Sequence, residues 1–418
     1  MTEASSAEQP VVVVGAGIIG VCCALYLLRG GHRVILLDRG APGEATSFGN
    51  GSIITEEAVV PVQTPGVARR VPGMLLDPLG PLSIRWGYLP KLAPWLLQFV
   101  QASSPKHVEA ISIALKALLT GAQSAYQPLV EMAGIQDMIQ RSGWLSVYET
   151  QKGFQAYQPM LELQRRRGVR FDVLPAEELR QLEPSLAPIF DRGVFYPDVS
   201  HTVNNFRFVQ ELAAAFVEGG GEIRRESVIG FDRAEASVKA VLTEAGRIDC
   251  SATVIAAGAW SKNLTKMLGW RPPLETERGY HLTLPEPGVS PRLPVYSTER
   301  GFVCTPLENG LRIAGTVELG GLKAEPNWKR AEVLYDNANR WFPGLERSGE
   351  TRWMGFRPSM PDSLPVIGPT PGCRNVLLAF GHGHCGLSLA GRTGEIIAEL
   401  VAGRDPGIDM APYRVDRF

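Results

Sequence analysis

The chain has 418 residues, of which 44% are hydrophobic and 20% charged, so it can bury a substantial core and form two or three domains. Lysine plus arginine (42) nearly balance aspartate plus glutamate (43), and therefore no overall charge draws the protein toward nucleic acid or anionic lipid. The six cysteines show neither a CxxC pair nor zinc-ligand spacing. This pattern predicts reduced thiols, no metal and a cytoplasmic setting.

The segment VVVVGAGIIG at residues 11–20 is the first structural signal. Four β-branched residues suit a buried strand, and three glycines with G-x-G-x-x-G spacing then lead into a helix that should reach about Leu28. Such glycines let the backbone and the helix N-terminus approach a pyrophosphate. A membrane span is the weaker interpretation, because the glycines interrupt the apolar run and no basic residue precedes it.

A second predicted strand, residues 33–37, ends at Asp38, which stands 23 residues after Gly15. An acid at this place can accept hydrogen bonds from a ribose. The alternative is that the glycines only tighten a buried turn. We predict a dinucleotide site whose first residues are Gly15, Ala16, Gly17, Ile18, Ile19, Gly20, Asp38 and Arg39.

Three later segments favour a flavin dinucleotide. Residues 46–52 (TSFGNGS) are small and hydrogen-bonding, and residues 252–260 predict a buried strand, a stretch of small residues and the start of a helix. Residues 381–388 open a helix that should reach about Ala402, and its positive end can stabilise the charge of a reduced flavin. The alternative for this last segment is a glycine-rich loop that merely begins a C-terminal helix.

Together with residues 355–368, which include GFRP and PDSLPVIG, these motifs resemble the D-amino acid oxidase superfamily of flavoproteins, nearest its bacterial D-amino acid dehydrogenase branch. The resemblance covers nearly the whole chain. Four segments are in addition similar to glyphosate oxidoreductase, which acts on an N-substituted glycine: residues 75–85, 274–284, 315–330 and 353–368.

The resemblance implies an α/β (α+β) fold, with a Rossmann-like FAD-binding domain and a substrate domain built from a mixed or antiparallel sheet and helices. We expect residues 9–60, 200–268 and 352–413 to form the FAD-binding domain, and residues 61–199 and 269–351 to form the substrate domain. The first eight or nine residues are expected to be a tail. In the substrate domain, periodicity predicts one helical stretch and several strands: 105–133, then 142–148, 278–284, 301–306 and 310–316.

The resemblance also implies non-covalent FAD, because no cysteine stands between Trp353 and Pro371, where some relatives attach their flavin. Further FAD contacts are expected from the small or polar residues of the later motifs: Ser47, Asn50, Gly51, Ser52, Val228, Ala257, Gly258, Trp260, Gly355, Gly383, His384, Gly386, Leu387 and Ser388.

The implied chemistry is hydride removal from the carbon next to an amine, with an imine as product. The resemblance assigns Arg357 to the substrate carboxylate, which a guanidinium fork pairs with in a bidentate way; the alternative is a structural pair with Asp362. It also assigns Tyr280 to the substrate. Among the histidines we expect His384 to take part in catalysis. His281 and His201 are expected to line the pocket.

We favour a D-amino acid or a small secondary amino acid such as a D-hydroxyproline, with electrons passed to a quinone or another acceptor. Residues 79–100 mix aromatic, leucine and basic side chains that suit a membrane interface, so the protein is expected in the cytoplasm with peripheral contact to the inner face of the membrane. The alternative is that these aromatic residues are core. Two other functions stay open: a flavoprotein that modifies transfer RNA, which the balanced charge disfavours, and a flavin-binding protein without turnover.

Overall fold

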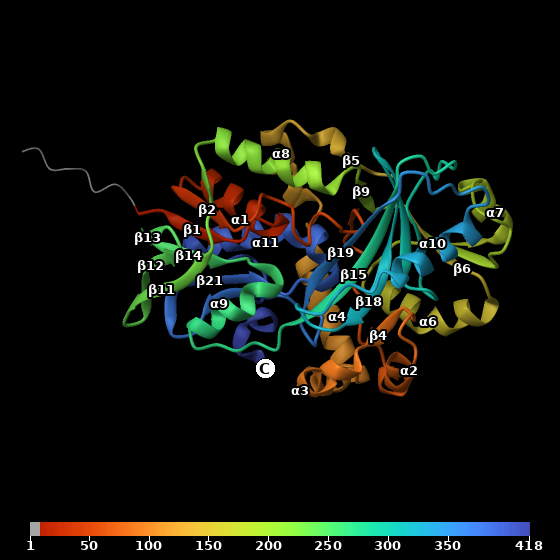
Figure 1. Cartoon of the computed structure of the whole chain (residues 1–418), viewed down its shortest axis with the longest axis horizontal. Helices are drawn as coiled ribbons and strands as arrows, with labels where there is room; N and C mark the ends of the chain where they lie inside the picture. Colours follow the sequence, from red (N-terminus) through yellow and green to blue (C-terminus); the bar gives the residue numbers. More distant parts are fainter. Residues whose placement is uncertain (1–8) are drawn as a thin grey trace, which may run out of the picture.

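The computed structural model describes residues 9–418, apart from the side chains of Arg70, Met74 and Leu75. The tail expected at the N-terminus lies outside them, except for residue 9. Two regions lie side by side (Figure 1), one around a six-stranded sheet and one around a nine-stranded sheet.

The six-stranded sheet has the order β10-β2-β1-β14-β21-β20, in which the first five strands are parallel and β20 is antiparallel to β21. Its strands are β1 (Val11–Val14), β2 (Val34–Asp38), β10 (Glu222–Arg225), β14 (Ala252–Ile255), β20 (Val366–Thr370) and β21 (Cys373–Phe380). Parallel sheets are normally covered on both faces, which explains why all four valines of β1 are buried.

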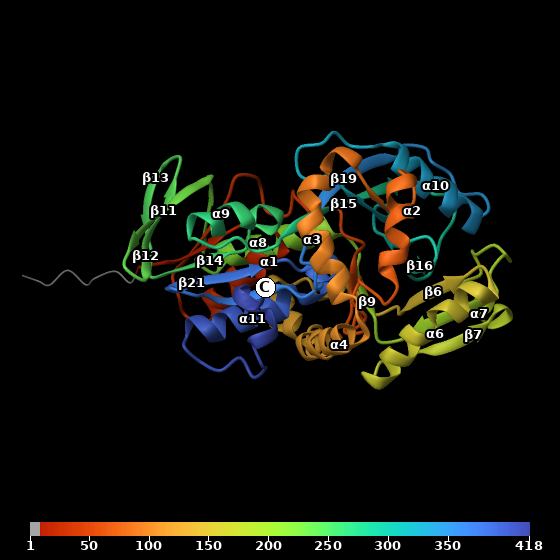
Figure 2. The same cartoon turned by 90° about the horizontal axis from the view of Figure 1, so that it is seen from below.

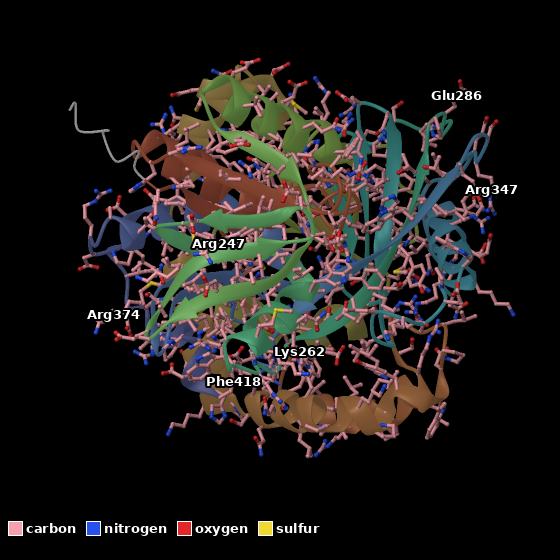
Figure 3. All side chains as sticks on the ribbon, turned by 60° about the vertical axis from the view of Figure 1, so that its left-hand side comes forward. Arg247, Lys262, Glu286, Arg347, Arg374 and Phe418 are labelled. Atoms are coloured by element: carbon pink, nitrogen blue, oxygen red, sulfur yellow. The ribbon has the colours of Figure 1, made fainter. Side chains whose placement is uncertain are left out.

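Alternate residues of β1 pack into two different cores. Val11 and Val13 face the helices α1 (Ile18–Arg29), α8 (Asn205–Glu218) and α11 (Gly386–Val401). Val12 and Val14 face a three-stranded antiparallel sheet and α9 (Ser261–Met267). That sheet comprises β11 (Val228–Ala234), β12 (Ser237–Thr243) and β13 (Gly246–Asp249). Figure 3 shows this side of the molecule, with Arg247 on β13 and Lys262 on α9.

The nine-stranded mixed sheet forms the second region, in the order β19-β15-β18-β17-β16-β6-β8-β7 with β4 beside β18. Its strands are β4 (Leu82–Ile84), β6 (Trp144–Tyr148), β7 (Asp172–Pro175), β8 (Arg192–Tyr196), β15 (Glu275–Leu284), β16 (Val295–Ser297), β17 (Phe302–Leu307), β18 (Gly310–Leu319) and β19 (Thr351–Ser359). One face of it packs on α10 (Lys329–Trp341), where Leu282 and Leu284 meet Leu334 and Trp341. The fold is therefore the predicted Rossmann-like sheet beside a mixed sheet.

The remaining helices cover the junction and the outer surface, and Figure 2 shows α3 and α4 running between the two regions. They are α2 (Val71–Leu76), α3 (Leu89–Ala102), α4 (Pro105–Leu119), α5 (Gln127–Ala133), α6 (Gln151–Arg166) and α7 (Ala176–Leu182). A small sheet, made of β3 (Ile53–Ile54), β9 (Ser200–Thr202) and β5 (Ile139–Gln140), lies beside them. The helical stretch expected at 105–133 is two helices, because the chain turns through Gly121 at a φ of 81°.

Residues 79–100 divide between core and surface. Trp95 and Phe99 stack with ring centroids 5.0 Å apart and are buried with Leu92, so for these aromatic residues the core interpretation is correct. Trp86 and Leu97 are exposed. Across residues 9–418, no helix combines the length and the apolar character that crossing a membrane requires.

Candidate active site

A cavity of about 560 Å³ lies where β1, β2 and β14 end, at the carboxyl edge of the parallel sheet. Open α/β sheets bind their ligands at this edge. The structure brings most of the predicted cofactor residues together on its wall: Gly15, Gly17, Ile18, Ile19, Asp38, Arg39, Ser47, Asn50, Val228, Ala257, Gly258, Trp260, Gly355, Gly383, Gly386 and Leu387.

The glycine turn has the geometry that its spacing predicts. Gly15 has a φ of 112°, and a Cβ there would lie 2.4 Å from the carbonyl oxygen of Ala256. A Cβ on Gly20 would lie 1.7 Å from the carbonyl oxygen of Gly15, so only glycine lets α1 pack this closely on the turn. The N–H of Ala16 donates to Asp38 Oδ2 at 2.7 Å. Ala16 and Gly20 therefore shape the turn and are not among the residues that line the cavity, so direct contact of these two with the cofactor stays a prediction.

The wall of this cavity suits FAD. A Cβ on Gly258 would have no heavy atom within 4 Å, and one on Gly17 would meet only Ser47 Oγ at 3.3 Å, so bare backbone faces open space at both places. The Arg39 guanidinium lies 4.2 Å from the ring centroid of Trp260. Asp38 also borders the cavity, and its carboxylate keeps acceptor capacity beyond its two backbone hydrogen bonds. The glycine turn could thus hold the pyrophosphate, Asp38 a ribose, and the start of α11 the flavin.

A second cavity, of about 1210 Å³, adjoins the first and lies against the nine-stranded sheet. The two share four lining residues: Asn50, Arg357, His382 and Gly383. Three residues predicted at the cofactor, Gly51, His384 and Ser388, line the second cavity and not the first. Ser52, fully buried with a φ of 71°, lines neither cavity, and among the described residues its hydroxyl has no hydrogen-bond partner, so its contact with the cofactor stays a prediction.

Arg357 on β19 stands at the junction of the two cavities. Its guanidinium lies across Gly279, where a Cβ would be 2.2 Å from Nη1, and Nη1 donates to the carbonyl oxygen of Thr316 at 3.1 Å. Asp362 instead pairs with Arg417 at 2.7 Å, so the alternative structural pair of Arg357 does not form. Burial lowers the pKa of Arg357 and Glu277 opposes this shift, yet a guanidinium stays charged.

Sequence reasoning missed Glu277. This buried carboxyl lines the second cavity, and its Oε2 lies 2.7 Å from Nε2 of His384, whose side chain is 42% exposed. Burial raises the pKa of Glu277, but His384 and Arg357 more than offset this effect and hold it below its usual value. Glu277 is directly opposite Arg357 in the β15–β19 ladder. Side chains alternate along a strand, so Glu277 leaves the same face of β15 as Gly279, which lies under the Arg357 guanidinium. This alternation is the signal that could have found Glu277.

Tyr280 does not reach either cavity, which contradicts its expected role at the substrate. Its hydroxyl donates to Glu318 Oε2 at 2.7 Å and accepts from the N–H of Asn327 at 2.9 Å. The ring is buried in the core under α10. Successive side chains of a strand point to opposite faces, so Glu277 and Gly279 face the cavities while Tyr280 faces the core.

Neither of the two histidines expected in the pocket lines it. His281 stacks on Trp353 with ring centroids 5.1 Å apart, and its Nδ1 lies 3.3 Å from the carbonyl oxygen of Gly49. His201 is buried in the small sheet, with its Nδ1 3.0 Å from Ser142 Oγ. Burial lowers the pKa of both, to about 4 for His201. They are core histidines, and sequence spacing carried no sign of their burial.

His382 does line both cavities, unlike those two. Its Nε2 lies 3.0 Å from the hydroxyl of Thr393 on α11, and burial lowers its pKa to about 3. This histidine is therefore neutral over the physiological range. It anchors the glycine-rich loop, which includes the short helix η6 (Gly383–Cys385), to the helix behind it.

Comparison with known proteins places this arrangement in a family. The model of the FAD dependent oxidoreductase (DAO) family matches residues 10–400. A D-amino-acid oxidase of Bradyrhizobium diazoefficiens is 41% identical over 415 residues, and a D-amino acid dehydrogenase of Paramagnetospirillum magneticum is 33% identical over 418, each match covering 98% of both chains. Glycine oxidase from Geobacillus kaustophilus has the same fold, with a TM-score of 0.77, 20% identity and coverage of 98% of this chain and 99% of that one. With the glycine turn, both cavities and Arg357 in place, the chain belongs to the FAD-dependent oxidoreductases of the DAO family, and FAD is its cofactor.

Proposed function

We propose that this enzyme oxidatively deaminates a D-amino acid or a small secondary amino acid by removing a hydride from the α carbon. The observation that carries the proposal is Arg357. Its guanidinium borders both cavities and, within residues 9–418, makes one hydrogen bond to the protein, so several of its five donors remain for a ligand. A substrate carboxylate placed there lies where the substrate cavity meets the cofactor cavity.

The cofactor, Arg357 and the two regions of the chain have different roles in this reaction. FAD, when bound, supplies the acceptor for the hydride that leaves the α carbon. Arg357 binds the carboxylate, which orients the α carbon and leaves the amine nitrogen free to form the C=N bond of the imine. Residues 9–60, 200–268 and 352–413 would hold the cofactor, and residues 61–199 and 269–351 would form most of the substrate cavity.

The names of the relatives support a D-amino acid, while the volume of the cavity leaves the side chain open. At about 1210 Å³ the substrate cavity exceeds the needs of a small amino acid, and its outer wall carries apolar residues such as Val67, Phe99 and Met160. D-Hydroxyproline and N-substituted glycines, including glyphosate, are therefore the alternatives.

An anaerobic screen tests the proposal. Purified holoenzyme is mixed with D- and L-amino acids, D-hydroxyproline, sarcosine and glyphosate, and bleaching of the flavin absorbance is recorded. We expect one class of α-amino acid to reduce the flavin with saturation, and its L enantiomer, where one exists, to be inert. A flavin that no amine reduces would overturn the proposal and favour a flavin-binding protein without turnover.

The electron acceptor is the second part of the proposal. We propose that a quinone or another carrier, and not oxygen, reoxidises the flavin, as the dehydrogenase name of several relatives suggests. The oxidase name of the relative with 41% identity is the competing indication. Stopped-flow reoxidation by ubiquinone-1, by a dye and by air-saturated buffer decides between them. Peroxide formation at the rate of dye-coupled turnover would make the enzyme an oxidase.

Contact with a membrane surface would place such a quinone within reach. Three large apolar side chains on α2, the short helix η2 (Trp86–Tyr88) and α3 are strongly exposed: Leu76 at 77%, Trp86 at 62% and Leu97 at 66%. Sedimentation with vesicles of phosphatidylethanolamine and phosphatidylglycerol tests this contact. Binding by the parent and loss of binding by Trp86→Ala are expected, and equal recovery of both in the supernatant would exclude the contact.

A further inference from the structure

Glu277 is a buried charge in the substrate cavity that the proposed function does not use. Its side chain is 6% exposed, and it lines the same cavity as Arg357. Because His384 and Arg357 outweigh the effect of burial on its pKa, the carboxyl is ionised at neutral pH. His384 holds one oxygen of this carboxylate, and the carboxylate keeps acceptor capacity toward the cavity that it lines.

Glu277 and Arg357 are opposite residues of adjacent antiparallel strands, and their side chains therefore leave the same face of the sheet. Arg357 helps to hold the pKa of Glu277 below its usual value, but the two side chains do not form a direct pair. Among the ion pairs of residues 9–418, none joins them; Glu277 is bound by His384 and Arg357 by the carbonyl oxygen of Thr316. A positive and a negative group thus stand side by side, each with capacity left for a ligand.

Cβ atoms of directly opposite residues are about 5 Å apart. That spacing suits a ligand that carries a negative and a positive group on one carbon atom. A zwitterionic α-amino acid has this form, with a carboxylate for Arg357 and an ammonium for Glu277. A 2-hydroxy acid or a simple carboxylic acid would instead place a second carboxylate near Glu277 and offer it no ammonium.

We propose that Glu277 is the ammonium subsite of this enzyme, and that it selects amino acids with a protonated primary or secondary amine over carboxylates that lack one. Before the hydride leaves the α carbon, the bound ammonium gives one proton to the Glu277 carboxylate, and the freed lone pair of the nitrogen then forms the C=N bond of the imine. His384 is a positioning residue: its Nε2 donates to Glu277 Oε2 and holds the carboxylate toward the cavity. The ionisable groups around the subsite are Arg357 on β19 and His384 in the loop before α11, while His382 in that loop is neutral because burial lowers its pKa to about 3. The inference rests on the proposed function and specifies the form of its substrate.

The experiment compares two ligands that differ only in the amine. One is the D-amino acid that reduces the flavin fastest in the screen. The other is the carboxylic acid with the same side chain and no nitrogen. D-Phenylalanine and 3-phenylpropionate are an example of such a pair. Saturation of anaerobic flavin reduction measures affinity for the first. Perturbation of the flavin spectrum, which requires no turnover, measures affinity for the second.

Glu277→Gln should weaken binding of the amino acid about ten- to a hundredfold, because a charge-assisted hydrogen bond is lost, and should leave the carboxylic acid unchanged or more tightly bound. Glu275→Gln is the matched control. Glu275 lies on the same strand and is buried, but its carboxylate holds the Tyr88 hydroxyl at 3.0 Å and does not line either cavity. This control should keep the parent's affinity for both ligands.

His384→Leu keeps the test decisive if Glu277→Gln does not retain FAD, because this side chain is partly exposed and its loss should not disturb the core. It should weaken amino acid binding severalfold, and His384→Gln, which restores a donor, should recover part. Equal weakening of both ligands, or unchanged amino acid binding in Glu277→Gln and His384→Leu, would overturn the subsite. Failure of the proposed function is distinct, since the parent itself would then not be reduced by any amino acid.

Discussion

The two cavities of this enzyme are built from different parts of the chain. The cofactor cavity is lined in part by glycine-rich segments: the turn at Gly15, the stretch before Gly258 and the loop before α11 all bring small residues to the edge of the parallel sheet. The substrate cavity is walled by side chains of β15, β17, β18 and α6, whose directions depend on strand alternation and on tertiary packing. Glycine motifs in the sequence therefore identify many residues of the cofactor cavity. The type and spacing of residues identify few of the side chains that line the substrate cavity.

The largest expected effect tests Arg357, the residue that both cavities share and that is proposed to bind the substrate carboxylate. Arg357→Met should lower kcat/KM for the amino acid substrate by about thirtyfold to several thousandfold, corresponding to roughly 2 to 5 kcal/mol, because the substrate carboxylate is left in a buried site without its counter-charge. FAD should stay bound. Arg357→Lys should recover only part, since an ammonium has no planar fork.

Steady-state kinetics with the FAD content of each variant check this expectation. The loss should shrink for an amine that has no carboxylate, which serves as the internal control. Parent values of kcat/KM in Arg357→Met would show that the substrate carboxylate is bound elsewhere.

The next effect concerns the backbone wall alone. Gly17→Val should weaken FAD binding by roughly 3 kcal/mol, about a hundredfold, because the branched side chain would enter the space of the cofactor. Gly17 has an ordinary φ of −71°, so the fold should persist. Gly87→Val, at an exposed glycine with no neighbouring atoms within 4 Å, is the control.

Flavin absorbance of the purified variants and calorimetric titration with FAD measure this effect. Heat denaturation of the parent should release FAD into the supernatant, as non-covalent binding predicts. Stoichiometric flavin in Gly17→Val would mean that the turn does not contact the cofactor.

Much of the fold was predictable because its signals are local. The VVVV run followed by glycines, the strand before Asp38 and the helix after residue 385 all stand where the pattern predicts them. The split between α4 and α5 was missed because periodicity continues across the turn at Gly121. Glu277 and Tyr280 show the other limit: one is a cavity residue and the other a core residue, and only the register of β15 against β19 tells them apart.

Tyr280→Phe sharpens that distinction. The change removes a hydrogen bond to Glu318 and leaves the N–H of Asn327 without its acceptor, so it should cost about 1 to 2 kcal/mol of unfolding free energy. Values of kcat/KM should stay within about threefold, since the hydroxyl faces the core. Urea unfolding and kinetics on one preparation measure both quantities. A tenfold rise in KM with unchanged stability would place Tyr280 at the substrate after all.

The smallest effect tests the assignment of His201 to the core. Burial lowers its pKa to about 4, whereas an unfolded histidine titrates near 6.5. Between these values the unfolded chain binds more protons than the folded one, so stability falls as the pH drops from about 6.5 toward 4. The free energy of unfolding that this histidine contributes should therefore be about 1 kcal/mol lower at pH 5.5 than at pH 7.5. His201→Asn keeps a polar atom for Ser142 but has no group that titrates in this range. Between pH 7.5 and 5.5, its free energy of unfolding should therefore fall by about 1 kcal/mol less than that of the parent. Thermal or urea unfolding at the two pH values measures the difference. Identical pH dependence in parent and variant would mean that His201 titrates alike in the folded and unfolded states, which would contradict its burial in the small sheet.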